Sequence, residues 1–280
     1  MTTAPPFASM FAKPEEVGNP SGILLYGPPG TWKTSTAGGI VKVPSFADKK
    51  VLYIDIDQGS KVFVNDPEVF AGVQEGRINI VPIDKLAPEA FGQLQYFLGA
   101  DDANGEFQKG EAFKWGYDVV ILDSLDVAQD VAVKWFMNHT IAEKTGKKDT
   151  LGAWGKVGPW TTDVAWAFQN YEGLGIVVMH SAESTSESGV FAIKPKLGGS
   201  AKDNIASIFD LVAYVDFEAN PEDRSDVQLV ATLGKSDYIV SKNRWMLPDK
   251  IWSFDLPSFY QMIHARRADT AKKAAALQAA

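Results

Sequence analysis

Near the start of the chain, a glycine-rich stretch ends in a lysine and a threonine, a combination suited to binding phosphate. The stretch is Gly27-Pro28-Pro29-Gly30-Thr31-Trp32-Lys33-Thr34-Ser35, and it follows the apolar run Ile23–Tyr26. In a phosphate loop between a strand and a helix, backbone N–H groups surround phosphate oxygens. The lysine adds positive charge near the β- and γ-phosphates, and the next hydroxyl binds Mg²⁺. We therefore expect this stretch to bind ATP, with Lys33 at the terminal phosphates, Thr34 on Mg²⁺ and Ser35 within reach of the α-phosphate.

Trp32 departs from the usual pattern of such loops. The pattern G-x-x-x-x-G-K-[ST] has glycine at this position, because glycine permits unusual dihedral angles and a close approach to phosphate. An indole must point away from the phosphates, towards solvent, the base or a neighbouring subunit. The alternative is a chance Gly/Pro turn, but the remaining glycines, the lysine, the threonine and the flanking strand and helix favour a phosphate loop.

A carboxylate follows a second apolar run. Val119–Leu122 ends in Asp123, about 90 residues after the glycine-rich stretch. In a doubly wound sheet, ligands bind beyond the carboxyl ends of the strands. Aspartate after a strand is also a common helix N-cap. Its position after a phosphate loop favours a role for Asp123 in binding Mg²⁺, together with Thr34 and with help from Ser124.

Two further apolar runs end in groups that could act on the attacking water. Val51–Ile56 carries Asp55 near its end and Asp57 just after it. Period-two alternation would place both carboxylates on one side, where either could polarise a water molecule; a polar strand end with an Asp turn is the alternative. His180 follows Ile176–Met179 and is expected beside the γ-phosphate as a sensor, although a lone histidine is more often structural.

The order of the apolar segments predicts an α/β fold. Strands are expected at Ile23–Tyr26, Val51–Ile56, Ile78–Pro82, Val119–Leu122 and Ile176–Met179. Helical spacing of apolar residues follows the fourth strand, over residues 125–136, and precedes the fifth, over 164–171. Alternating strands and helices indicate a mostly parallel, twisted sheet flanked by helices. After Asp210, strands without intervening helices indicate an antiparallel C-terminal extension, at Leu211–Val215, Val227–Leu233 and Tyr238–Ser241.

Composition narrows the class of protein. The chain has no cysteine, which excludes disulfides and thiolate metal sites, and its net charge is −8. That charge does not favour a broad basic face for duplex DNA. No apolar run approaches the roughly 20 residues that cross a bilayer, and the N-terminus has no signal-peptide pattern. We expect no membrane partner and a cytoplasmic location.

The chain divides most simply into one domain with two appendages. Residues 1–20 contain four prolines and are expected to form an irregular arm. Residues 21–264 would form the ATPase domain. Residues 265–280 form an Ala-rich tail.

Five segments together resemble the RecA-like recombinase core, over roughly residues 20–250. These segments are YGPPGTWKT, VLYIDID, VVILDS, VVMHS and VSKNRW. The likeness extends to phage-encoded RecA-like ATPases of the single-strand annealing (Sak) type and to the core of bacterial RadA. The resemblance implies a RecA-like P-loop NTPase fold that hydrolyses ATP with Mg²⁺ and assembles into a ring or filament. It places Asp57 at the catalytic carboxylate position, where the family usually has glutamate.

The same resemblance gives Lys242 and Arg244 a role across a subunit boundary. In RecA-like assemblies, a basic pair at this position reaches the γ-phosphate of the neighbouring subunit. On a strand the two cations would project to one face. The alternative is a solvated strand edge, where lysine is favoured.

In this family, two loops bind DNA, one after the helix that follows the Asp123 strand and one after the His180 strand. They correspond here to residues 144–160 and 181–202. Lysines interleaved with indoles suit single strands, since bases stack on aromatic rings and cations contact phosphates; loops rich in lysine and glycine are often merely solvated. The candidate DNA contacts are Lys144, Lys147, Lys148, Trp154, Lys156, Lys194, Lys196 and Lys202.

The sequence thus predicts a RecA-like ATPase that acts on single-stranded DNA in recombination, annealing or repair. One alternative is a hexameric motor or helicase-type ATPase on the same core. The other is a nucleotide-binding assembly protein in which Trp32 has weakened or abolished hydrolysis.

Overall fold

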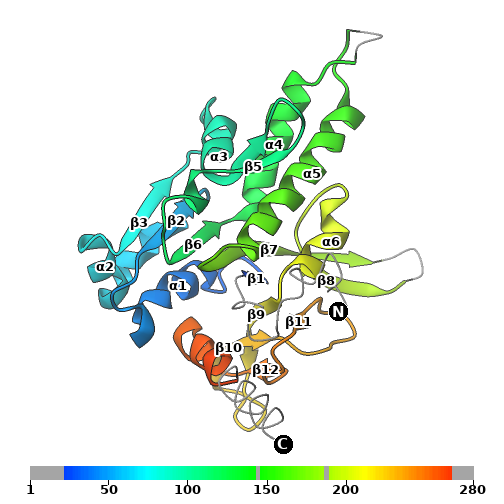
Figure 1. The fold of residues 1–280 in the computed structure, drawn as a ribbon. Helices are drawn as coiled ribbons and strands as arrows, with labels where there is room; N and C mark the ends of the chain where they lie inside the picture. Colours follow the sequence, from blue (N-terminus) through cyan, green and yellow to red (C-terminus); the bar gives the residue numbers. More distant parts are fainter. Residues whose placement is uncertain (1–21, 143–145, 186–188, 267–280) are drawn as a thin grey trace, which may run out of the picture.

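The computed structural model describes residues 22–142, 146–185 and 189–266. The expected arm at 1–20 and most of the expected tail lie outside these ranges. Within them, ten strands form one sheet in the order β12-β10-β9-β1-β7-β6-β2-β3, with β8 paired to β7 and β11 to β9 (Figure 1). The strands are β1 (Gly22–Gly27), β2 (Val51–Asp55), β3 (Ile78–Pro82), β6 (Val119–Asp123), β7 (Leu174–Thr185), β8 (Phe191–Pro195), β9 (Leu211–Ala219), β10 (Val227–Thr232), β11 (Lys242–Asn243) and β12 (Lys250–Ile251). β4 (Gly99–Asp101) and β5 (Phe107–Lys109) form a separate pair.

The centre of the sheet is parallel and its C-terminal side is antiparallel. β1 pairs in parallel with β7 and β9, and β7, β6, β2 and β3 continue the parallel arrangement. β10, β11 and β12 join in antiparallel pairs. The predicted fold class, a mostly parallel sheet with an antiparallel C-terminal extension, is confirmed.

Helices cover both faces of this sheet, which explains why its central strands are continuously apolar. Ile23 and Leu25 of β1 face one core, while Leu24 and Tyr26 face the other. Onto the first face pack α1 (Lys33–Gly38), α2 (Pro67–Gln74) and the helix at 256–266. Onto the second pack α3 (Ala90–Leu98), α4 (Leu125–His139), α5 (Thr150–Gln169) and α6 (Ala201–Ile208).

The segment expected as the first loop, residues 144–160, is mostly helix, so the expectation of a loop there was wrong. Asp149 caps the start of α5 by accepting a hydrogen bond from the backbone N–H of Gly152. Trp160 is buried within α5, and its indole N–H donates to the Gly99 carbonyl at 2.9 Å. The half-buried Trp154 packs its ring against the Gly198–Gly199 backbone. Both indoles therefore contribute to the packing between elements, Trp160 as a buried side chain and Trp154 as a half-buried one.

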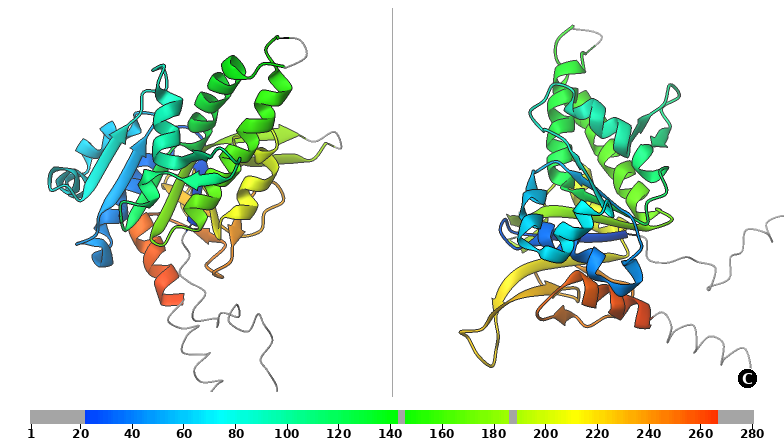
Figure 2. Two further views of the ribbon diagram at one scale, coloured as in Figure 1. Left: turned by 45° about the horizontal axis from the view of Figure 1, so that its top comes forward. Right: turned by 90° about the vertical axis from the view of Figure 1, so that its left-hand side faces the viewer.

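The second expected loop is instead a β-hairpin followed by a helix. β7 continues past the sheet to Thr185 and pairs there with β8, and the hairpin projects from the body of the molecule beside the α4–α5 pair (Figure 2). The expected strand at Tyr238–Ser241 is also corrected. Its backbone pairs with Ile193 of β8 in an isolated bridge, and β11 begins only at Lys242.

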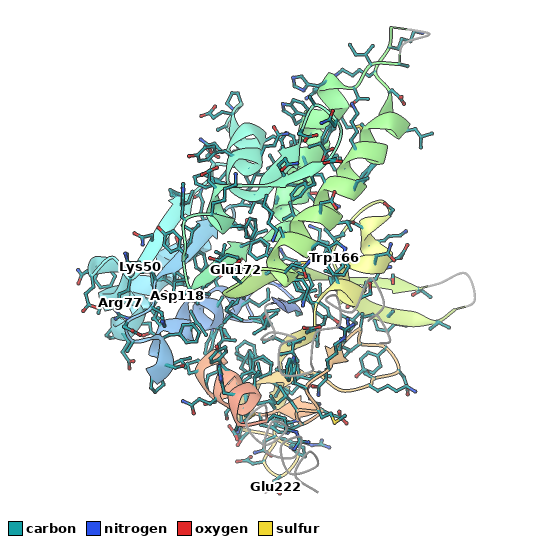
Figure 3. The ribbon with its side chains drawn as sticks, in the orientation of Figure 1. Lys50, Arg77, Asp118, Trp166, Glu172 and Glu222 are labelled. Carbon is teal, nitrogen blue, oxygen red and sulfur yellow. The ribbon has the colours of Figure 1, made fainter. Side chains whose placement is uncertain are left out.

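The starts and the ends of the parallel strands form two opposite edges of the sheet, and these edges carry different residues. Lys50, Asp118 and Glu172, labelled in Figure 3, stand at the edge from which β2, β6 and β7 start. There the Lys50 backbone N–H donates to the Asp118 carboxylate at 2.9 Å. The predicted phosphate, metal and sensor residues lie at the opposite edge, where the strands end. In the described ranges, no helix is long and apolar enough to cross a membrane.

Candidate functional site

The loop after β1 has the conformation that its glycines predict. Gly27 ends the strand so close to β9 that an added Cβ would lie 2.0 Å from the Val215 carbonyl oxygen. Gly30 has φ +84° and Trp32 has φ 52°, so the chain turns through left-handed conformations before α1 starts at Lys33. The half-buried Ser35 follows in the first turn of this helix. The loop N–H groups and this turn are positioned to surround an anion.

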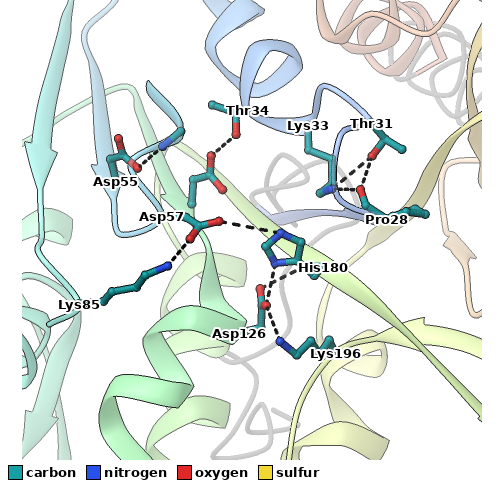
Figure 4. A network of polar contacts seen from close by, with 12 residues as sticks. Pro28, Thr31, Lys33, Thr34, Asp55, Asp57, Lys85, Asp126, His180 and Lys196 are labelled. Atoms are coloured by element: carbon teal, nitrogen blue, oxygen red, sulfur yellow. Dashed lines mark hydrogen bonds and ion pairs between the residues drawn. The ribbon is translucent and has the colours of Figure 1, made fainter. Parts of the chain in front are cut away.

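Lys33 lies inside this loop rather than in solvent. Its side chain is buried, and its ammonium donates to the Pro28 carbonyl at 2.6 Å and to the Thr31 hydroxyl at 3.2 Å (Figure 4). Burial lowers the pKa of Lys33, and the carboxylates around it, Asp123 foremost, counteract part of that effect. An ammonium held by neutral oxygens in this way can exchange those contacts for phosphate oxygens.

Trp32 adopts a backbone conformation that glycine adopts without strain. Its dihedral angles are φ 52° and ψ 23°, a left-handed region that costs other residues roughly 1–2 kcal/mol. The indole is 63 % exposed and meets the ring of Phe217 edge to face, with ring centroids 5.1 Å apart. The side chain thus lies outside the loop, as its size requires.

Thr34 and Asp123 meet although they are far apart in the chain. The Thr34 hydroxyl donates to Asp123 Oδ2 at 2.6 Å, and the buried Tyr53 hydroxyl donates to the same oxygen at 2.6 Å. Burial raises the pKa of Asp123, which the two hydrogen bonds oppose. An oxygen-only pair of this kind fits Mg²⁺, which prefers hydroxyl and carboxylate ligands and keeps several waters. No larger group of metal-binding side chains occurs within the described ranges.

Asp55 and Asp57 have separate partners, and the strand alternation behind the prediction does not extend to Asp57. β2 ends at Asp55, whose carboxylate accepts hydrogen bonds from the backbone N–H groups of Gly59 and Ser60 at 3.0 Å. Asp55 therefore stabilises a turn. Asp57 lies beyond the strand, with Oδ1 2.6 Å from the Lys85 ammonium and Oδ2 3.9 Å from His180 Nε2.

His180 is held by a carboxylate that the sequence analysis missed. Its Nδ1 lies 2.8 Å from Asp126 Oδ2, and its backbone N–H donates to Asp126 Oδ1 at 3.2 Å. Because a carboxylate only accepts, Nδ1 carries the proton and Nε2 faces Asp57 (Figure 4). The hydrogen bond that His180 donates to Asp126 raises the pKa of His180. Burial alone would raise the pKa of Asp126, but its contacts with His180 outweigh burial and lower it.

Asp126 gave no distinctive signal in the sequence. It lies in the first turn of α4, where acidic residues are common because they complement the helix dipole. Only the pairing of β6 with β7 brings this turn against His180. A carboxylate three residues after a strand-ending aspartate could have been weighed as a partner for a histidine on the neighbouring strand.

Lys242 and Arg244 lie far from the phosphate loop of their own chain. β11 pairs Lys242 with Val212, at the start of β9, whereas the loop follows the end of β1. Only Lys242 belongs to the strand, so the expected alternation of two cations on one strand does not hold. Lys242 donates to the Ser207 carbonyl at 2.6 Å, and Arg244 to Asp210 Oδ1 at 2.6 Å.

The candidate nucleic-acid lysines lie on two separate projections. Lys144 is outside the described residues. Lys147 and Lys148 lie near the tip of the α4–α5 pair, and the exposed Lys156 lies on α5. Lys194 lies on β8, Lys196 just after it and Lys202 on α6. The structure therefore gathers these residues into two groups.

Gly59 offers a test of the Thr34–Asp123 pair. A Cβ at this position would lie 2.8 Å from Thr34 Oγ1 and 3.4 Å from Asp123 Oδ2. We expect Gly59→Ala to displace the threonine hydroxyl and to weaken Mg²⁺-dependent ATP binding by roughly 10-fold. Calorimetric titration with Mg²⁺ and with EDTA measures the effect. Gly39→Ala is the control, because its Cβ would meet nothing within 4 Å; equal affinities in both variants would contradict the assignment.

The His180–Asp126 pair predicts a pH-dependent stability. The pKa of His180 is raised, so the pair's contribution is complete below the unfolded value of about 6.5 and is lost as pH rises through the folded pKa. The pKa of Asp126 is lowered, so its share disappears only in acid, as pH falls through that pKa. Asp126→Asn should therefore lower the free energy of unfolding more at about pH 5.5 than at about pH 9, by urea denaturation. An equal loss at both pH values would show that the pair carries no charge.

Comparisons with known proteins identify the family of this chain. No curated protein matches the chain. Among solved structures, the flagellar accessory protein FlaH from Methanocaldococcus jannaschii is similar at 12% identity and a TM-score of 0.47, with 84% of this chain and 86% of that chain covered. A KaiC-like protein from Pyrococcus horikoshii is similar at 13% identity and a TM-score of 0.43, with 76% and 78% covered. Neither likeness adds to what the strand order establishes. A family model described as AAA domain (AAA_24) matches residues 19–245, and the chain therefore belongs to that family of ATPase-type domains.

Proposed function

We propose that this chain binds ATP with Mg²⁺ at the carboxyl edge of its parallel sheet and hydrolyses it. The observation that carries the proposal is the 2.6 Å hydrogen bond between Thr34 and Asp123, which are 89 residues apart. It joins the first turn after the glycine-rich loop to the end of β6. Thr34 and Asp123 would hold Mg²⁺ there, and the ion would neutralise charge on the phosphates. Lys33, buried in the loop, would contact the same phosphates.

Asp57 and His180 are suited to positioning the attacking water. Their facing atoms are 3.9 Å apart, too far for a direct hydrogen bond, and one water can bond to both. In the reaction, the water oxygen bonds to the γ-phosphorus, the bond from that phosphorus to the β–γ bridging oxygen breaks, and ADP and phosphate leave. Asp57 Oδ2 would accept the water proton, while Asp126 keeps the imidazole oriented.

Lys242 and Arg244 are proposed to serve a neighbouring subunit in a ring or filament. Leu211, next to Asp210, pairs with Ile23, four residues before Gly27, which places Arg244 about 13 Å along the strands from its own loop. From that edge, the two cations cannot contact phosphates bound by the same chain. A neighbour stacked edge to edge could receive them at its γ-phosphate, where they would stabilise the charge of the transition state.

A mixing experiment tests hydrolysis and assembly together. Lys33→Ala should abolish ATP binding, and Lys242→Ala/Arg244→Ala should keep binding by isolated subunits while ATPase turnover falls at least about 10-fold. Mixing the two variants should restore part of the activity, because a Lys33→Ala subunit still offers its cations to an intact loop. Phosphate release measures turnover, and sedimentation checks co-assembly. ATP binding by Lys33→Ala would refute the loop assignment, and no recovery despite co-assembly would place the cations on a plain solvated edge.

Single-stranded DNA is the proposed polymer on which this ATPase acts, in recombination, annealing or repair. The favouring observation is that two projections carry lysines, with Lys147 and Lys148 exposed on one, and the half-buried Lys194 and the exposed Lys196 on the other. Lys196 also lies 3.9 Å from Asp126, the partner of His180, so the second projection adjoins the nucleotide site. Because Trp160 is buried and Trp154 is half-buried, binding would rest mainly on charge and would weaken steeply with salt.

We expect single-stranded DNA to stimulate ATPase turnover, and Lys147→Ala/Lys148→Ala to reduce the stimulation without changing basal turnover. Steady-state phosphate release with and without an oligonucleotide, at two salt concentrations, provides the measurement. Lys109→Ala, a lysine bound to Asn170 away from both projections, is the control. Turnover indifferent to DNA would favour an assembly ATPase, and strand separation would favour the helicase-type motor. Nucleotide binding without turnover would favour the assembly protein that does not hydrolyse ATP.

A further inference from the structure

An aromatic pair beside the phosphate loop has no part in the proposed hydrolysis. Trp32 is 63 % exposed and Phe217 is 36 % exposed. Their ring centroids are 5.1 Å apart and their planes lie at 89°. In a perpendicular pair, the phenyl ring can cover at most one broad face of the indole. At least one face of the Trp32 indole is therefore not covered by Phe217. Because Trp32 directly precedes Lys33, this uncovered face belongs to a residue of the phosphate loop itself.

The fold places Phe217 at this position with little freedom. β9 pairs with β1 and contacts the loop so closely that Gly27 has no room for a Cβ against Val215. Phe217 follows two residues later. Its backbone N–H donates to Asp216 Oδ1 at 2.8 Å, and the Tyr214 hydroxyl donates to Asp216 Oδ2 at 2.7 Å. The Phe217 ring that contacts Trp32 is thus fixed in position by a strand of the sheet.

Trp32 serves no evident purpose in the folding of the loop. It stands at the N-cap of α1 without a side-chain capping bond, in a left-handed conformation that strains any side chain. Its ring is largely exposed, so it buries little apolar area. Strain at an exposed residue in a ligand-binding loop points to a use in binding.

We propose that Trp32, supported by Phe217, stacks on the base of the nucleotide whose phosphates the loop binds, and so selects purine over pyrimidine nucleotides. The inference rests on the proposed function, because it concerns the same bound nucleotide. Aromatic rings stack on bases of every kind, and the larger purine ring system offers the greater overlap. Phe217 holds the indole by its edge contact, and the loop sets the position of the phosphates. The two contacts together define where the base lies.

The test compares binding of Mg²⁺ complexes of ATP, CTP and inorganic tripolyphosphate by calorimetric titration. The variants are Trp32→Gly, which suits the left-handed backbone, and Phe217→Ala. The control is Trp166→Ala, an indole on α5 that is 45 % exposed and away from the loop (Figure 3). Circular dichroism confirms that each variant is folded. The parent should bind ATP more tightly than tripolyphosphate by roughly 5- to 100-fold, with CTP between them.

Trp32→Gly should bring ATP affinity down to that of tripolyphosphate and leave tripolyphosphate affinity unchanged. Phe217→Ala should cause a smaller loss in the same direction, and Trp166→Ala none. An unchanged ratio of ATP to tripolyphosphate affinity in Trp32→Gly would overturn the inference while leaving the proposed function intact. If that ratio holds and the variant alone fails to assemble in sedimentation, the indole contacts a second subunit instead, which also overturns it. No Mg²⁺-dependent binding of ATP or tripolyphosphate by the parent would refute the proposed function itself, and the inference with it.

Discussion

The buried carboxylate of Asp123 connects the three chain segments that form the centre of the candidate site. It receives hydrogen bonds from Thr34 and from Tyr53, and so joins the loop after β1 and the strand β2 to the end of β6. None of the three segments is near another in sequence. An unpaired carboxylate at this depth would be costly, so the two donors are needed if the anion is to persist. The positions of Thr34 and Tyr53 in the candidate site follow from the need to donate hydrogen bonds to this carboxylate.

The strand order explains why this meeting point is also the candidate binding site. β7 lies between β1 and β6, so the point at which it leaves the main sheet presents His180 between the glycine-rich loop and Asp123. Parallel strands that end at one edge bring side chains from separate β–α units to one place. Lys242 and Arg244 lie instead at the opposite edge, where the parallel strands start, because β11 pairs with the beginning of β9. A subunit built in this way carries one set of polar groups at each edge.

The sequence located the strands that are buried on both faces, because such strands are continuously apolar. β1, β2 and β6 were placed within one residue at each end, and the partly buried β3 has the predicted bounds. α5 was recognised only in its second half, because the family resemblance placed a loop over its first half; tertiary packing keeps Gly155, Gly158 and Pro159 in the helix. The extension of β7 into a hairpin was missed because its outer residues are polar. Asp126 was missed since its contact with His180 exists only across two paired strands.

The length of β7 has a mechanical consequence. From Leu174 to His180 the strand is bonded within the main sheet, and from Ser181 to Thr185 it is bonded to β8. A hydrogen-bonded ladder resists sliding, so a load on the hairpin passes along β7 to the point where one set of bonds gives way to the other, and through Ile193 of β8 to residues 238–240. His180 occupies that point on β7, and the Lys196 backbone N–H bonds to its carbonyl at 2.9 Å. The candidate sensor residue thus lies where the hairpin joins the main sheet, so a force applied far out on the hairpin reaches it through the strand itself.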